Sequence, residues 1–249
     1  MTLRAIENRS LADEVFGQLL GELIGERWAP GDRLPAERVL SATFGVNRHV
    51  VREALGRLEQ LGLVRIVQGG GTQVLDPRRS AGLDLLAALA EHAAAVEAPL
   101  GPLRAALEMR AGIGSDVARL CAQRAGPELH PALQTACDDL AASPGGVVVL
   151  ALDERFWRLV LEGADNFAYE LAFNSLIRGV HALPRVSVPW LEHELAAGRY
   201  RRPIADAITA GDPDGAAQAA RQALAPAAEA FTVLASAAPS PPREQESGP

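Results

Sequence analysis

The sequence contains no lysine, so all 24 basic side chains among its 249 residues are arginines. It has only two cysteines, Cys121 and Cys137, and their spacing fits neither a disulfide framework nor a zinc site. We expect both to be small buried side chains in a reducing compartment. No apolar run reaches the roughly 18 residues that span a bilayer. The first ten residues also lack the apolar segment of a secretory signal. These absences predict a cytoplasmic protein that does not enter a membrane.

The remaining composition is that of a soluble globular chain, with 48% hydrophobic and 22% charged residues. Its length suggests one or two domains. The net charge of −7 is unevenly distributed. Residues 1–79 hold 11 arginines and 10 acidic residues, whereas residues 80–249 hold 13 arginines and 21 acidic residues. Arginine presents the forked donors that bind phosphate and guanine. The near-neutral N-terminal part is therefore the candidate for binding nucleic acid.

Three helices and a hairpin are predicted in the N-terminal part. Ser10 followed by Asp13 resembles a capping box, and Pro30-Gly31-Asp32 is expected to end the helix that follows. A second helix is predicted from about Pro35 to Gly45, and a third between a capping Asn47 and Gly62. Two β-prone runs, 63–67 and 72–75, surround a glycine turn at 69–71 and predict a hairpin. This order is that of a helix-turn-helix followed by a two-stranded wing.

The third helix has one apolar side, formed by Val51, Ala54, Leu55, Leu58 and Leu61. Arg48, His49 and Arg52 then point away from the core, close to the helix N-terminus. That end of such a helix meets base edges in the major groove. The alternative is that Arg48 and Arg52 merely form a solvated face.

Four motifs in this region carry a family resemblance: GDRLPAER at 31–38, GVNR at 45–48, VREAL at 51–55 and GGGT at 69–72. Together they resemble the winged helix-turn-helix of the GntR superfamily of transcriptional regulators, over residues 8–76. The resemblance implies DNA contacts from Arg38, Asn47, Arg48, His49, Val50, Arg52, Gln68 and Gly69. Ala36 stands where the family often has a capping serine, so the second helix lacks a side-chain cap. His49 and Val50 replace frequent small hydroxyl residues, so the operator is expected to differ.

The rest of the chain is predicted to be helical, which makes the fold class mainly α. Residues 77–101 are expected to form a linker and a first helix, residues 102–234 an antiparallel bundle, and residues 235–249 a disordered tail. The predicted helices cover 83–96, 103–124, 129–140, 147–161, 166–183, 204–210 and 213–234, with a loop at 144–146. The β-branched run at 147–150 is the least helix-like of these. The bundle resembles the FCD-type domain of the FadR-like branch, which binds an effector and dimerises.

In many members of that branch one aspartate and three histidines bind a divalent metal. The aspartate position matches Asp153, but the histidine positions carry Trp157, Arg201 and Ala223, so we expect no metal cofactor. We hypothesise that Arg201 pairs with Asp153 while Trp157 fills the vacated volume. The alternative is a solvated Arg201. The resemblance also places Arg110 and Asn166 in the effector pocket. Arg110 either binds an effector carboxylate or pairs within its own helix near Glu108.

These patterns predict a homodimeric transcriptional repressor on double-stranded DNA with a palindromic operator. A small organic acid or acyl compound is the expected effector. One alternative is a helical domain that only dimerises, with its sensor cavity plugged by Trp157. A more remote alternative is a hydrolytic enzyme using Asp153 and Glu154. Adjacent helical residues point about 100° apart, however, and the sequence has no nucleophile elbow, P-loop or zinc-protease motif.

Overall fold

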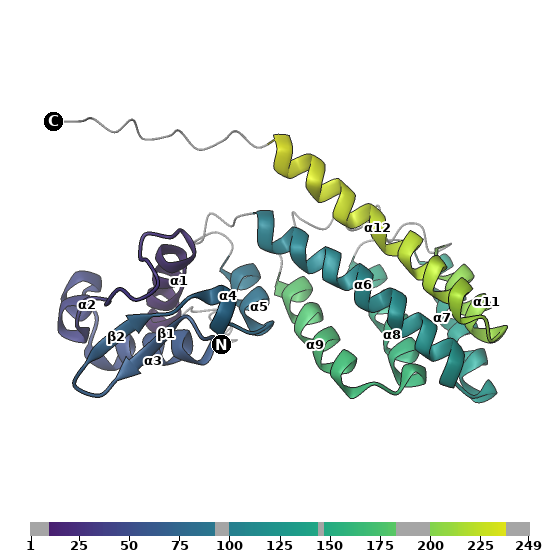
Figure 1. Cartoon of the computed structure of the whole chain (residues 1–249), viewed down its shortest axis with the longest axis horizontal. Helices are drawn as coiled ribbons and strands as arrows, with labels where there is room; N and C mark the ends of the chain where they lie inside the picture. The colour runs from purple at the N-terminus through teal and green to yellow at the C-terminus, as the bar shows by residue number, and fades with distance from the viewer. Residues whose placement is uncertain (1–9, 93–99, 144–146, 183–199, 238–249) are drawn as a thin grey trace, which may run out of the picture. The chain divides into compact units, whose positions relative to one another are not determined.

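The computed structural model describes residues 10–92, 100–143, 147–182 and 200–237 (Figure 1). The chain divides into two compact units. The first contains the described residues up to 92 together with 175–182, and the second contains 100–174 and the described residues from 200 onward. Each unit has its own hydrophobic core.

The first unit contains the predicted winged helix-turn-helix. Its elements are α1 (Leu11–Ile24), α2 (Glu37–Phe44), α3 (Arg48–Gln60), β1 (Val64–Val67) and β2 (Gly71–Val74). The two strands pair antiparallel, with Val64 opposite Val74, and Arg33 adds an isolated bridge to Gln73. Buried residues of all three helices and both strands share one core. The predicted fold of this region is therefore confirmed.

Helix ends in the first unit follow their capping residues. The Ser10 hydroxyl accepts the Asp13 amide at 3.1 Å, as expected of an N-cap. α1 nevertheless ends at Ile24, well before Pro30, because Gly25 caps it and Glu26 takes a φ of 58°. The prediction that Pro30 ends this helix was wrong. α2 has no side-chain cap at Ala36, as predicted.

The segment after the hairpin is more ordered than a linker. α4 (Pro77–Ser80) is a single turn capped by Asp76, and α5 (Asp84–Glu91) places Ala88 and Leu89 in the core of the first unit. His92 follows α5 and is 4% exposed, with its Nε2 3.3 Å from the Asp13 carboxylate. The first unit therefore extends past the predicted boundary at residue 76. Residues 93–96 of the predicted helix lie outside the described residues.

Asp13 joins three elements of this unit. Its carboxylate accepts a hydrogen bond from Arg57 of α3 at 2.9 Å and faces His92, so it does not complete the predicted capping box. Burial opposes ionisation of this carboxyl, but the hydrogen bond from Arg57 and the neighbouring His92 outweigh it and lower the pKa of Asp13. The carboxylate thus links α1 to the last turn of α3.

We expect Asp13→Asn to flatten the acid limb of the stability profile. Because the native pKa of Asp13 is lower than its unfolded value of about 3.9, the ionised form stabilises the native state above about pH 4. That stabilisation is lost as the pH falls through the native pKa. Thermal unfolding followed from pH 7 to pH 3 measures it, with Glu14→Gln, an exposed carboxylate of the same helix, as the control. Parallel pH profiles for wild type and Asp13→Asn would contradict the assignment.

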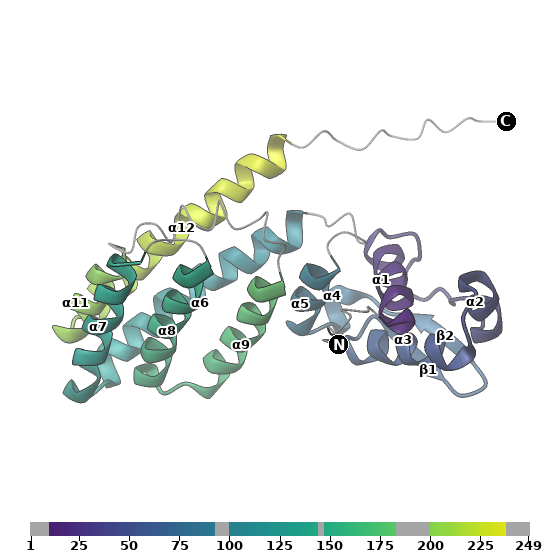
Figure 2. The ribbon, with the colours of Figure 1, turned by 180° about the vertical axis from the view of Figure 1, so that it is seen from behind.

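The second unit is built from helices. These are α6 (Leu100–Arg124), the short 3₁₀ turn Pro127–Leu129, α7 (His130–Ala141), α8 (Val147–Ala164), the first half of α9 (Phe167–Ala182), α11 (Arg202–Thr209) and α12 (Pro213–Ala237). α12 packs along α6, as both ribbon views show (Figures 1 and 2). The predicted helical fold is confirmed.

Two segments of this unit, 147–150 and 235–237, are helical where the sequence carries weak or no helix signals. Residues 147–150 are helical despite their β-branched side chains, because Val149 is buried there. α12 continues to Ala237, so residues 235–237 of the predicted tail are helical instead of disordered. Residues 144–146 and 238–249, for which a loop and the rest of the tail were predicted, lie outside the described residues.

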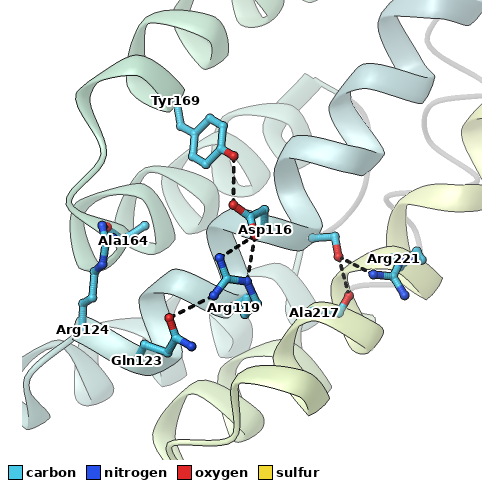
Figure 3. A network of polar contacts seen from close by, with 9 residues as sticks. Asp116, Arg119, Gln123, Arg124, Ala164, Tyr169, Ala217 and Arg221 are labelled. Carbon is cyan, nitrogen blue, oxygen red and sulfur yellow. Dashed lines mark hydrogen bonds and ion pairs between the residues drawn. The ribbon is translucent and has the colours of Figure 1, made fainter.

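Polar contacts tie the helices of this unit together (Figure 3). The Tyr169 hydroxyl of α9 donates to the Asp116 carboxylate of α6 at 2.9 Å, and Arg119 donates to the same carboxylate. This hydrogen bond raises the pKa of Tyr169, because the neutral hydroxyl is the donor. On another side of α6, Ser115 donates to the Ala217 carbonyl of α12. The network fixes the positions of α9 and α12 on α6.

The two cysteines are free and buried, as expected from the sequence. Burial raises the pKa of Cys121 to about 12 and that of Cys137 to about 11, so both are protonated thiols at neutral pH. They act as small apolar side chains of the core. Among the described helices, none is both long enough and apolar enough to cross a membrane.

Candidate nucleic-acid interface and effector site

The N-terminus of α3 is held firmly within the first unit. Asn47 caps the helix, its Oδ1 accepting the Val50 amide at 3.0 Å. The opposite side of α3 is fully buried through Val51, Ala54, Leu55 and Leu58, each at most 1% exposed. This burial fixes the rotation of the helix about its axis. The remaining side of α3 therefore faces outward, as the sequence predicts.

Arg48, His49 and Arg52 of the predicted DNA-contacting set lie on that outward side of α3, and the others, apart from Val50, come from α2, the helix cap and the hairpin turn. Arg38, Arg48, His49 and Arg52 are exposed. Asn47 uses Oδ1 for the cap, which leaves its Nδ2 available to bind DNA. Val50 is only half-exposed and packs against the core, so its role is at least partly structural. Gln68 and Gly69 are exposed at the hairpin turn, where Gly69 takes a φ of +72° that favours glycine.

The ion pairing of these arginines differs. Within the described part of the chain, Arg38 and Arg48 form no ion pair, whereas Arg52 donates from Nε to the Glu37 carboxylate at 2.7 Å. Sequence reasoning did not find Glu37, because the residues are fifteen apart and on different helices. It also missed Arg33 and Arg65, two exposed arginines on either side of Gln73 across the sheet. Their neighbourhood depends on the pairing of three chain segments, which no local motif reveals.

A second cluster of charged side chains lies inside the helical unit. Arg201, which precedes α11 and is 2% exposed, donates from Nε to the Asp153 carboxylate at 2.6 Å. The hypothesised pair is therefore present, 48 residues apart in the sequence. Arg110 of α6 approaches the other oxygen of Asp153 at 3.7 Å. Glu108, the intrahelical partner considered for Arg110, forms an ion pair with Arg104 at 3.5 Å.

Trp157 fills the space beside this ion pair. It is 5% exposed, and the Arg201 guanidinium lies 5.4 Å from the centre of its ring. A Cβ at Gly114 of α6 would lie 3.3 Å from the Trp157 ring and 2.4 Å from Leu224, so the packing there is tight. The Trp157 Nε1 is buried and has no hydrogen-bond partner among the described residues. A buried donor of this kind normally has an acceptor.

Asn166 does not belong to this cluster. It caps α9, accepting hydrogen bonds from the amides of Ala168 at 3.1 Å and Tyr169 at 3.3 Å. Asn166 lies beyond the end of α8 at Ala164, and Asp153 is about 16 Å before that end at about 1.5 Å per residue. The motif that contains Asn166 thus specifies a helix start, and its place in the effector pocket stays a prediction.

The residues around Asp153 do not fit a divalent metal. A metal needs several neutral or anionic donors, and the positions where the resemblance expects histidines hold the indole of Trp157, the guanidinium of Arg201 and the methyl group of Ala223, which is 1% exposed. The guanidinium already occupies one oxygen of the carboxylate. Over the described ranges, no group of three or more histidine, cysteine or acidic side chains is suitably placed to hold an ion.

A winged helix-turn-helix joined to a helical unit defines a transcriptional regulator that binds DNA. Comparison with known proteins identifies the family of regulators to which the chain belongs. Residues 11–74 match the family described as bacterial regulatory proteins, gntR family, and residues 105–225 match the FCD domain. The chain belongs to the GntR family and carries the FCD domain of its FadR-like branch. It is a regulator and not an enzyme, and Glu154, proposed as a catalytic residue in the remote alternative, pairs with Arg158 at 2.6 Å.

Several relatives align along nearly the whole chain. The transcriptional regulator Mce2R of Mycobacterium tuberculosis is 37% identical over 227 residues, covering 90% of this chain and 92% of its own length. The transcriptional repressor NanR of an Enterobacter species is 29% identical over 224 residues, covering 89% and 85%. The solved structure of Lar from Listeria monocytogenes has a TM-score of 0.56 and 15% identity, covering 92% of this chain and all of its own. That likeness supports the fold.

Proposed function

We propose that this protein is a transcriptional repressor that binds a palindromic operator as a homodimer and acts in the cytoplasm. The observation that carries the proposal is the exposed, unpaired Arg48 at the N-terminus of a capped α3 whose opposite side is fully buried. A guanidinium held there matches the major-groove edge of guanine. The repressor NanR among the relatives supports the direction of control.

The predicted contacts are of two kinds, those to base edges in the major groove and those to the DNA backbone and the minor groove. Arg48, His49 and Arg52 would read base edges, while Arg38 and the turn at Gln68 and Gly69 would bind phosphate and the adjacent minor groove. Two copies related by a two-fold axis would place their α3 helices one turn of DNA apart. A palindrome is the direct consequence of that symmetry.

We also propose that a small organic acid or acyl compound controls DNA binding through the cluster around Asp153, without a metal. Arg110 and Arg201 both contact the carboxylate of Asp153, and beside them the buried Trp157 Nε1 is a donor without an acceptor among the described residues. An effector carboxylate would bring an acceptor oxygen for the Trp157 Nε1 and a negative charge close to the two guanidinium groups. The resemblance to FCD domains, which bind effectors, supports the same location.

The tight packing of Trp157 against Gly114 favours a second candidate, in which the helical unit only dimerises. The two candidates predict different thermal behaviour. A ligand at 100 times its Kd stabilises the native state by about 2.7 kcal/mol, whereas a filled site gives no shift. Thermal unfolding of the full chain with a panel of carboxylates and acyl thioesters decides between them.

Selection of bound fragments from random duplex DNA tests the DNA-binding proposal. A two-fold symmetric sequence with half-sites about 10 base pairs apart is the expected result. Sedimentation of the protein with that duplex gives the stoichiometry, which should be two chains per site. An asymmetric sequence bound by one chain would refute the homodimer.

A further inference from the structure

The contact between Arg52 and Glu37 connects the two helices of the helix-turn-helix. Arg52 uses Nε to reach Oε2 of Glu37 at 2.7 Å, and its Nη1 and Nη2 have no hydrogen-bond partner among the described residues. The Arg52 side chain is 67% exposed and that of Glu37 is 31% exposed. The end of the guanidinium therefore stays available while its orientation is fixed from the side.

This carboxylate stands in a place where it opposes DNA binding in general. DNA phosphates repel it, and its bond to the Arg52 Nε restricts the phosphate positions that Nη1 and Nη2 can reach. An exposed ion pair also adds little to folding stability. Of the three arginines in the predicted DNA-contacting set, Arg52 is the one with a carboxylate partner in the part of the chain that the structure describes. A role in choosing DNA sites explains the pair better than affinity or stability does.

We infer that Glu37 is a positioning residue that makes Arg52 selective for the operator. Held through Nε, Arg52 presents its Nη1 and Nη2 edge in one direction, where an acceptor in the correct register satisfies it. On other sequences the acceptor is displaced, and the Glu37 charge opposes the phosphate contact that a free arginine would make instead. The inference rests on the proposed docking of α3 in the major groove.

Glu37→Gln in the full chain tests this inference, because it removes the charge with little change in size. We expect it to bind a scrambled duplex about threefold to tenfold more tightly at low salt, with a salt slope steeper by about 0.9, since Arg52 gains one phosphate contact. Operator affinity should change much less, so the ratio of operator to scrambled affinity falls. A structural defect would weaken both and could not produce tighter binding.

Glu22→Gln is the matched control. Glu22 of α1 forms an exposed pair with Arg27, also at 2.7 Å, and lies outside the predicted contact set. The substitution removes the same charge and should leave the affinity ratio unchanged. Equal changes in the two variants would show a general charge effect and overturn the role of Glu37.

Arg52→Ala separates the inference from the docking on which it rests. If Arg52→Ala binds the selected operator as wild type does, Arg52 makes no contact and the docking is wrong at this position. If Arg52→Ala weakens operator binding but Glu37→Gln leaves the ratio within about twofold of wild type, the docking stands and the inference fails. Glu37→Asp keeps the charge but shortens the side chain. It should lower the ratio by weakening the operator complex, and an unchanged ratio would count against positioning.

Discussion

Asp153→Asn is expected to destabilise the helical unit by about 3–5 kcal/mol, the largest stability effect of any single substitution proposed for this chain. The substitution leaves Arg201, 2% exposed, without the carboxylate that accepts its Nε at 2.6 Å. Water cannot take the place of that carboxylate, because the side chain is enclosed by the core. Urea unfolding followed by circular dichroism measures the change, since most of the described residues of this unit are helical.

An exposed pair in the same unit gives the matched control. Arg155 of α8 and Asp139 of α7 are 2.7 Å apart, but their side chains are 53% and 41% exposed. Asp139→Asn should cost less than about 1 kcal/mol, because water solvates the arginine that remains. Similar costs for Asp139→Asn and Asp153→Asn would show that burial does not set the strength of the Asp153 pair.

The double substitution Asp153→Leu with Arg201→Met distinguishes a missing partner from a missing side chain. Replacing both charges with apolar groups of similar size often restores stability, because desolvation offsets much of the attraction in a buried pair. We therefore expect the double variant to be more stable than Asp153→Asn. If effector binding depends on these charges, the double variant should also lose the thermal shift given by any carboxylate that stabilises wild type.

The N-terminal unit could be predicted closely because its signals are local. The cap at Asn47, the left-handed glycine at Gly45 and the apolar spacing of α3 each act within a few residues. The C-terminal end of α1 was harder to place, since Gly25 ends the helix before the stronger signal at Pro30. Residues close together in the sequence determine which segments are helical and in what order. Competing capping residues determine where each helix ends.

The contacts that join distant segments could not be predicted in the same way. Glu37 with Arg52, and Asp13 with His92, depend on how whole helices pack. The Arg201 pair was predicted because a buried carboxylate that loses its metal requires another cation, which is a physical constraint at any sequence separation. The cap that Asn166 makes for α9 was not predicted, because the resemblance gives positions and not the contacts that each side chain makes.

Arg48→Ala should weaken operator binding by about tenfold to a hundredfold and relax the preference at one base position. Arg48 is the first residue of α3. It is exposed and has no ion pair among the described residues, so its guanidinium group can approach guanine directly. A bidentate contact of that kind contributes about 1–3 kcal/mol of discrimination against the wrong base. Selection from random DNA by wild type and variant, compared position by position, measures the loss.

Two results would identify Arg48 as something other than a base-reading residue. If affinity falls equally on all sequences and the salt slope becomes shallower by about 1, Arg48 binds only phosphate. If the variant binds like wild type, α3 does not enter the groove by its N-terminus. Arg27→Ala, at an exposed arginine that follows α1 and lies outside the predicted contacts, should leave both affinity and base preference unchanged. Loss confined to one base position in Arg48→Ala would fix the register of α3 on the operator, from which the remaining contacts follow by helical geometry.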